Sequence, residues 1–157
     1  MTRIITKFAQ KKTAMKKISR TALLNYSAKQ MYDVVNDVAR YPEFLPWCGG
    51  ARVLMADELS MQAEVTIAKL GLKQVFKTQN HLTPNQRIEM RLLEGPFSHL
   101  QGEWTFKALG EQACKINFEI EFEVSSGLLK VALNSIFEQI ANTFVSSFVA
   151  RAEQIYG

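Results

Sequence analysis

The sequence has little of what builds covalently linked or metal-supported folds. It contains only two cysteines and two histidines among 157 residues. Cys48 and Cys114 have neither the spacing of zinc ligands nor a redox CxxC pattern, and one cysteine pair in a chain of this length is no disulfide framework. His81 and His99 have no carboxylate or cysteine at ligand spacing. We therefore expect no metal centre and a reducing cytoplasm as the home of the protein.

Long apolar runs and recognisable catalytic motifs are also missing. No stretch of about 18 apolar residues is present to span a membrane, and no secretory signal is recognisable. The chain has no nucleophile elbow, P-loop, dinucleotide fingerprint or zinc-protease motif. Glu119, Glu121 and Glu123 alternate with apolar residues, so they are expected to face solvent rather than to act as acid and base. We therefore expect a protein that is not an enzyme.

Positive charge is concentrated at the start of the chain. Six of the 19 basic residues and none of the 15 acidic ones fall in residues 1–17, which leaves 13 basic against 15 acidic residues elsewhere. We expect residues 1–16 to be a disordered basic tail and residues 17–157 to be one domain. Because Met15 directly precedes the regular pattern, two interpretations stay open: a true arm for RNA or anionic surfaces, or an extension from an upstream start site.

The first part of the domain predicts a strand, a helix and an irregular connector. Residues 18–24 alternate loosely as a strand does, and Ser27 followed by Gln30 forms a capping box that starts a helix. The connector Tyr41–Cys48 reads YPEFLPWC, in which Pro42 and Pro46 prevent both a regular helix and a regular strand. Its aromatic and aliphatic side chains must pack on a core, line a cavity or contact a partner.

The rest of the chain predicts strands and then one long helix. Between residues 52 and 124 apolar residues alternate with polar ones, most clearly at 59–68 and 114–124, and short turns separate the strands. Residues 128–155 repeat apolar side chains at steps of three and four, which predicts a helix on the order of 40 Å long. We therefore expect an α+β fold in which a curved antiparallel sheet of six or seven strands wraps around this helix and leaves a cavity open at one end.

Two motifs and their order resemble a known family. The segments NDVARYPEFLPWC and LLEGPFSHLQGEWTF, together with the long closing helix, resemble the START-like helix-grip family, which includes coenzyme Q-binding and polyketide-cyclase-like proteins. The resemblance covers about residues 17–156. It implies the helix-grip fold that the residue patterns also predict.

The resemblance implies two main functions. Family members of the coenzyme Q type are non-enzymatic proteins that bind a prenylated quinone such as ubiquinone and support respiration, and this is the function we favour from sequence. The opening segment and the GPF turn look closest to bacterial ribosome-association toxins, which bind the large ribosomal subunit and block subunit association and translation. A polyketide-cyclase-like enzyme is a distant third possibility. The resemblance further implies a lipid or quinone as the only bound small molecule, possible peripheral contact with the inner membrane, and no DNA partner.

The same resemblance suggests where a hydrophobic ligand would bind. The YPEFLPWC connector and the turn at Gly95 are expected to form two lips of a cavity mouth, with Phe97 held out at the rim, while the sheet supplies the floor and the long helix the opposite wall. The alternative, that both motifs merely cap the core, stays open. The expected ligand-binding residues are Tyr41, Phe44, Leu45, Trp47, Pro96, Phe97, Trp104, Phe106, Ile140, Phe144 and Phe148.

Overall fold

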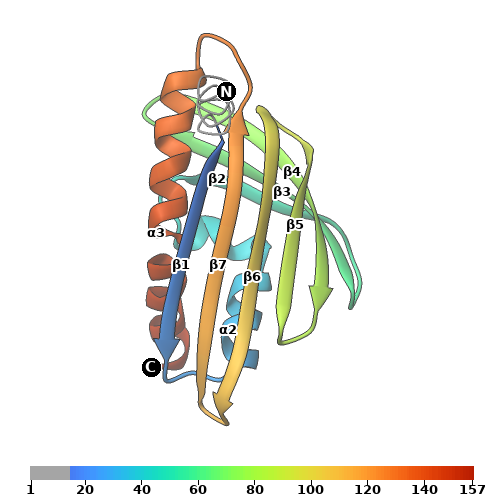
Figure 1. The fold of residues 1–157 in the computed structure, drawn as a ribbon, viewed down its shortest axis with the longest axis vertical. Helices are drawn as coiled ribbons and strands as arrows, with labels where there is room; N and C mark the ends of the chain where they lie inside the picture. The colour runs from blue at the N-terminus through green and yellow to red at the C-terminus, as the bar shows by residue number, and fades with distance from the viewer. Residues whose placement is uncertain (1–14) are drawn as a thin grey trace, which may run out of the picture.

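Seven strands form one antiparallel sheet in residues 15–157, which are the residues that the computed structural model describes (Figure 1). The strand order is β1-β7-β6-β5-β4-β3-β2. The strands are β1 (Lys16–Leu24), β2 (Cys48–Ala56), β3 (Ser60–Lys69), β4 (Leu72–Thr83), β5 (Arg87–Glu94), β6 (Phe97–Gly110) and β7 (Ala113–Val124). The helices are α2 (Ala28–Asn36), the 3-10 helix η1 (Val38–Glu43) and α3 (Lys130–Tyr156). The predicted α+β helix-grip architecture is confirmed, whereas the predictions for residues 1–14 lie outside the described residues.

The start of α2 follows the predicted capping box. The Ser27 hydroxyl accepts a hydrogen bond from the Gln30 backbone N–H at 3.0 Å, and the Gln30 side-chain oxygen accepts one from the Ser27 N–H at 2.9 Å. Both bonds satisfy backbone donors that a helix leaves unpaired at its first turn. After α2 the 3-10 helix η1 leads into the connector, with Pro42 inside it. The connector therefore follows the C-terminal end of α2 almost directly.

The curvature of the sheet brings distant segments around α3. In Figure 1, α3 runs beside β1 and β7, while β3, β4 and β5 curve away on the other side. The alternation predicted for residues 114–124 is confirmed, since the even-numbered residues of β7 are buried against the helices. One face of the sheet therefore forms the core, and the other carries the glutamates.

Two strand boundaries differ from the sequence prediction. Strand β2 begins at Cys48 and includes the Gly49–Gly50 pair, which we expected to precede the strands. A Cβ atom at Gly49 would lie 2.8 Å from the Cβ of Ala68, so glycine lets β2 approach β3 closely. Strand β6 begins at Phe97, directly after the turn at Gly95, rather than at Leu100. Within residues 15–157, no helix combines the length and apolar character needed to cross a membrane.

Candidate functional site

Most of the predicted site residues meet in one group of aromatic rings, here called the aromatic cluster. Four elements contribute to it: the connector, the strands β6 and β7, and the second half of α3. Each ring in the cluster has its centroid within 6.4 Å of at least one other. The members are Tyr41, Phe44, Trp47, Trp104, Phe106, Phe118, Phe144 and Phe148.

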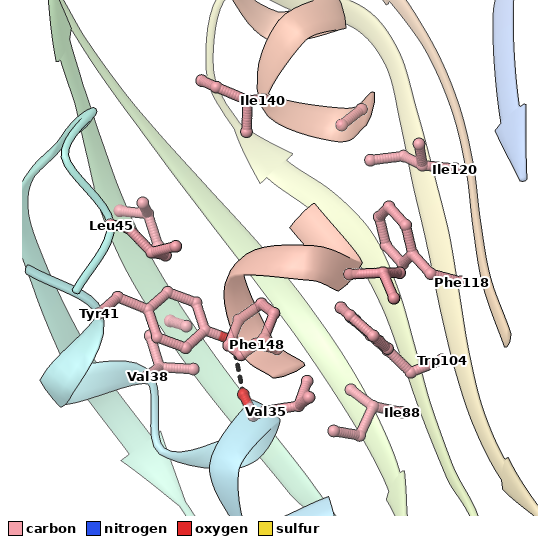
Figure 2. Packing of buried hydrophobic residues seen from close by; sticks show 14 of the residues in the cluster. Val35, Val38, Tyr41, Leu45, Ile88, Trp104, Phe118, Ile120, Ile140 and Phe148 are labelled. Carbon is pink, nitrogen blue, oxygen red and sulfur yellow. Dashed lines mark hydrogen bonds between the residues drawn. The ribbon is translucent and has the colours of Figure 1, made fainter. Parts of the chain in front are cut away.

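Phe148 lies at the centre of the aromatic cluster. Its ring centroid is 5.2 Å from that of Tyr41, 5.4 Å from Phe44, 5.3 Å from Trp104 and 4.9 Å from Phe144. Figure 2 shows Phe148 between Tyr41 of the connector and Trp104 of the sheet. All four contacts are edge-to-face, the geometry that aromatic pairs prefer. Phe148 therefore joins the connector to the sheet, as its neighbour Phe144 also does.

Tyr41 anchors the connector to the end of α2. Its hydroxyl donates a hydrogen bond to the Val35 carbonyl oxygen at 2.5 Å. Because the last carbonyls of a helix have no partner within the helix, this bond satisfies one of them from the side. Burial raises the pKa of Tyr41 far above its ordinary value of 10.0. Tyr41 is therefore a neutral donor at physiological pH and a structural anchor.

Phe44 lies where the aromatic cluster meets the surface, and it is only partly buried. The guanidinium carbon of Arg151 is 5.0 Å from the centre of its ring, a cation–π distance. Arg151 also donates a hydrogen bond to Glu43 at 2.9 Å. These two contacts of Arg151 join the connector to α3 at the surface, where we expected one lip of the cavity mouth.

Phe97 does not occupy the rim position that we predicted. It is only 5% exposed and packs in a second aromatic group with Phe76 and Phe137, at centroid distances of 5.8 and 4.9 Å. The turn before it needs glycine as expected, because Gly95 has φ +155° and a Cβ there would lie 2.6 Å from the Cβ of Phe76. Phe97 points inward because the register of β6 against β7 shifts between Phe97 and His99, which places Phe97 on the same buried face as Leu100. Pro96 is half-buried beside it.

The predicted floor and wall of the cavity touch each other. The floor residue Trp104 has its ring centroid 5.7 Å from that of the wall residue Phe144, and Trp104, Phe118 and Phe148 are fully buried. The remaining predicted residues, Leu45 and Ile140, are buried as well (Figure 2). The aromatic side chains therefore fill the place where we expected an open cavity between Trp104 and α3.

Two buried polar atoms lack hydrogen-bond partners within the described residues, the indole N–H of Trp104 and the side-chain oxygen of Asn36. A buried donor without an acceptor costs roughly 1–3 kcal/mol. The Trp104 N–H is the more informative one, because the four rings that contact Trp104 are all phenylalanines and offer no conventional acceptor. Sequence reasoning named Trp104 as a floor residue but gave no signal that its N–H is unpaired.

Both cysteine thiols are buried. Burial raises the pKa of the Cys48 thiol and of the Cys114 thiol, which disfavours the reactive thiolate. Within residues 15–157, no three His, Cys, Asp or Glu side chains are placed to hold a metal ion. His99 contacts Glu121 at 3.0 Å on the outer face of the sheet.

Surface lysines fall into paired and unpaired sets. Lys77 lies 3.4 Å from Glu94 and 3.9 Å from Glu64. Lys107 of β6 and Lys115 of β7 lie directly opposite each other in register, and neither forms an ion pair with a described residue. Like charges directly opposite each other destabilise a strand pair. An anion bound near both ammonium groups would reduce this repulsion.

Comparison with known proteins identifies the relatives of this chain. Residues 24–149 match the family described as polyketide cyclase / dehydrase and lipid transport. The chain is 52% identical over 140 residues to a Pseudomonas aeruginosa protein named ribosome association toxin RatA, and the match covers 89% of this chain and 97% of that protein. It is 27% identical over 143 residues to the mitochondrial coenzyme Q-binding protein COQ10 homolog B of Xenopus laevis, covering 88% of this chain and 59% of that protein.

A solved structure shows the same fold. The crystal structure of the Zhui aromatase/cyclase from Streptomyces superposes with a TM-score of 0.77 at 17% identity and covers 89% of this chain and 94% of that one. At this identity the likeness concerns the fold alone. The predicted START-like resemblance is therefore confirmed by both sequence and structure.

Proposed function

This chain belongs to the polyketide cyclase / dehydrase and lipid transport family, and from that premise we propose that it is a ribosome-associating toxin of the RatA kind that acts by binding rather than by catalysis. The observation that carries the proposal is the 52% identity, which extends over 97% of the Pseudomonas aeruginosa toxin. The quinone-binding function that we favoured from sequence becomes the second candidate, because its named relative is only 27% identical. Following the resemblance, the partner is the large ribosomal subunit and the effect is a block of subunit association.

The packing of the interior supports binding through an outer surface. The aromatic cluster fills the space between sheet and helix, so a large partner would contact only exposed residues. The buried thiols with raised pKa and the ion-paired carboxylates of the outer face are suited to stability. A protein that acts by binding needs neither a reactive thiol nor a reactive carboxylate.

Lys107 and Lys115 are the best candidates for contact with ribosomal RNA. They form an unpaired like-charge pair on the outer face near the β6–β7 turn. A phosphate near both ammonium groups would remove their repulsion and release counterions, which makes binding depend on salt. Thr105 and Asn117 lie opposite each other in the adjacent register position and can add neutral hydrogen bonds to a nucleic-acid backbone.

The experiment mixes purified protein with ribosomal subunits and separates them on sucrose gradients. We expect the protein to co-sediment with the large subunit and to lower the fraction of joined ribosomes as its concentration rises. Absence of co-sedimentation at low salt, or equal binding to both subunits with no effect on joining, would contradict the proposal.

A matched pair of variants tests the RNA contact. Lys107→Gln with Lys115→Gln should weaken large-subunit binding and reduce the salt slope by about two ion equivalents. Lys29→Gln with Lys17→Gln removes the same charge from lysines that already contact Asp33 and Glu121. This control should bind nearly as wild type. Equal losses in both variants would indicate a general charge effect rather than a contact at the pair.

One observation favours the second candidate, a hydrophobic ligand with a carbonyl group such as a prenylated quinone. The Trp104 N–H is buried and has no acceptor among the described residues, and a ligand carbonyl oxygen would supply one. Access requires the partly buried Phe144 to move away from Trp104. The fold itself is that of a lipid-transport family, which is consistent with such a ligand.

Native mass spectrometry with solvent extraction tests this candidate. A stoichiometric quinone in protein purified from bacterial cells, lost in Trp104→Phe but kept in the control Trp47→Phe, would support it. Both variants shorten a tryptophan of the aromatic cluster, but only the first removes the unpaired N–H. Protein that is empty in all three forms would count against a resident quinone and leave the ribosome proposal untouched.

A further inference from the structure

Four large aliphatic side chains are exposed together where α3 begins. Leu128 is 103% exposed, Leu70 88%, Val131 83% and Leu129 51%. We call these four residues the apolar tip. Leu70 and Leu129 line one groove of about 320 Å³ between the β3–β4 turn and α3, and Leu128 and Leu129 line the groove beside it. The tip therefore comes from two segments that are distant in sequence and adjacent in space.

The backbone at Leu70 is unusual for a leucine. Leu70 has φ +53° and Gly71 has φ +80°, so the two central residues of the β3–β4 turn are both in the left-handed region. Glycine, asparagine and aspartate are the residues suited to that conformation, and leucine pays a steric cost in it. A strained, almost fully exposed leucine has no role in the core. Such an outlier points to a function for its side chain.

The charge around the apolar tip has one sign. Lys69, Lys73 and Lys130 lie within or beside the two segments, and residues 65–73 and 124–137 contain no aspartate or glutamate. None of the three lysines forms an ion pair with a residue from 15 to 157. The start of α3 adds positive potential, because it has no side-chain cap and no acidic residue in its first turn.

We propose that the apolar tip with its three lysines docks on an anionic membrane surface, with the aliphatic side chains entering the headgroup region and the lysines contacting lipid phosphates. Aliphatic insertion combined with a basic surround is the chemistry of interfacial membrane binding. Docking two copies tip to tip would instead bring six lysines together. Contact with an RNA backbone would use the lysines alone and would leave the four exposed aliphatic side chains without an apolar environment, which a lipid headgroup region supplies.

This surface differs from the one proposed for ribosomal RNA. In Figure 1 the β6–β7 turn, near Lys107 and Lys115, lies at the bottom, whereas the loop into α3 lies at the top. The two proposals can therefore fail independently, because each is tested with its own variants and its own partner.

The experiment is co-sedimentation of the full chain with lipid vesicles. We expect binding to vesicles of phosphatidylcholine mixed with phosphatidylglycerol, weakening with salt, and much weaker binding to phosphatidylcholine alone. A tip variant carrying Leu70→Asn, Leu128→Gln and Val131→Gln should lose at least about tenfold in affinity. Replacing the three lysines by glutamine should cost about fivefold for each lysine.

The control variant makes the same kind of substitution, exposed leucine to glutamine, away from the apolar tip. Leu23→Gln with Leu109→Gln removes two leucines that are 71% and 53% exposed on other parts of the sheet, and it should bind vesicles as wild type does. The proposal is overturned if wild type ignores anionic vesicles, binds neutral ones equally, or loses as much in the control as in the tip variant. It is also overturned if the tip variant keeps vesicle binding but loses ribosome binding, since the tip would then be part of the ribosome surface.

Discussion

The first turn of α3 and its second half lie in opposite surroundings. In its second half, Phe144, Phe148 and Ala152 face the aromatic cluster or the buried core, and Tyr156 reaches α2, where its hydroxyl is 3.4 Å from the Gln30 carbonyl oxygen. At its first turn, Val131 and the preceding Leu128 are almost fully exposed and the helix has no side-chain cap. One helix thus begins with an exposed turn, and part of its second half packs in the core.

The difference shows that apolar residues in one helix can serve two purposes. The second half is held by ring contacts with three other elements, so its side chains determine the stability of the fold. The first turn contributes little to burial, which leaves its aliphatic side chains free to contact a partner. Substitutions in the second half should therefore change stability, and substitutions at the first turn should change binding.

Phe148→Ala should have the largest effect. Removing a fully buried ring with four aromatic neighbours should lower the free energy of unfolding by about 3–5 kcal/mol. Val131→Ala, a truncation of an exposed residue in the same helix, should change it by less than about 0.5 kcal/mol. Urea unfolding followed by far-UV circular dichroism measures both. Similar losses in the two variants would break the proposed division of α3.

Tyr41→Phe should have an intermediate effect on the connector side of the aromatic cluster. The ring contacts remain, but the hydrogen bond to the Val35 carbonyl is lost, which should cost about 1–2 kcal/mol. The comparison with Phe148→Ala separates the polar anchor from the ring packing. A loss as large as that of Phe148→Ala would mean that the hydroxyl, rather than the rings, holds the connector in place.

Tyr41 also predicts a pH dependence. Burial raises its folded-state pKa above the ordinary value of 10.0, so the folded protein holds this proton more tightly than the unfolded chain does. The stabilisation is fully present below about pH 10 and is lost as pH rises beyond it. Unfolding curves of wild type between about pH 9 and pH 11 should show this loss, and Tyr41→Phe should show a smaller one. The raised pKa values of Cys48, Cys114, Tyr32 and Tyr156 act in the same direction and contribute slope in both proteins.

The fold could be predicted from sequence because its local signals agree with one another. The capping box at Ser27 and the alternation in residues 114–124 both depend on near neighbours, and both are found in the structure. The start of β2 was missed because a Gly-Gly pair usually signals a turn. The Gly-Gly pair lies within β2 because of tertiary packing, since Gly49 allows close approach to Ala68 on the neighbouring strand.

The candidate site could be predicted only in part. Sequence reasoning selected rings that do meet, such as Tyr41, Trp104 and Phe148, because motif aromatics and a helical stripe both face the core. Whether those rings enclose a space or fill it depends on side-chain packing across the sheet, which no periodicity encodes. The apolar tip was missed for a related reason: Leu128 and Val131 were counted into a helix whose first turn the sheet does not cover.

Leu70→Asn should have a small effect on stability, with the opposite sign to that of Phe148→Ala and Tyr41→Phe. Asparagine adopts the left-handed conformation that Leu70 now occupies, so the free energy of unfolding should rise by up to about 1 kcal/mol. The same substitution removes an 88% exposed aliphatic side chain from the apolar tip and should weaken vesicle binding. Leu59→Asn, at a 58% exposed leucine without a positive φ, controls for the change in side chain. A more stable protein that binds membranes less well would show that Leu70 is kept for binding at the expense of stability, whereas a less stable protein would place Leu70 among the residues that hold the fold.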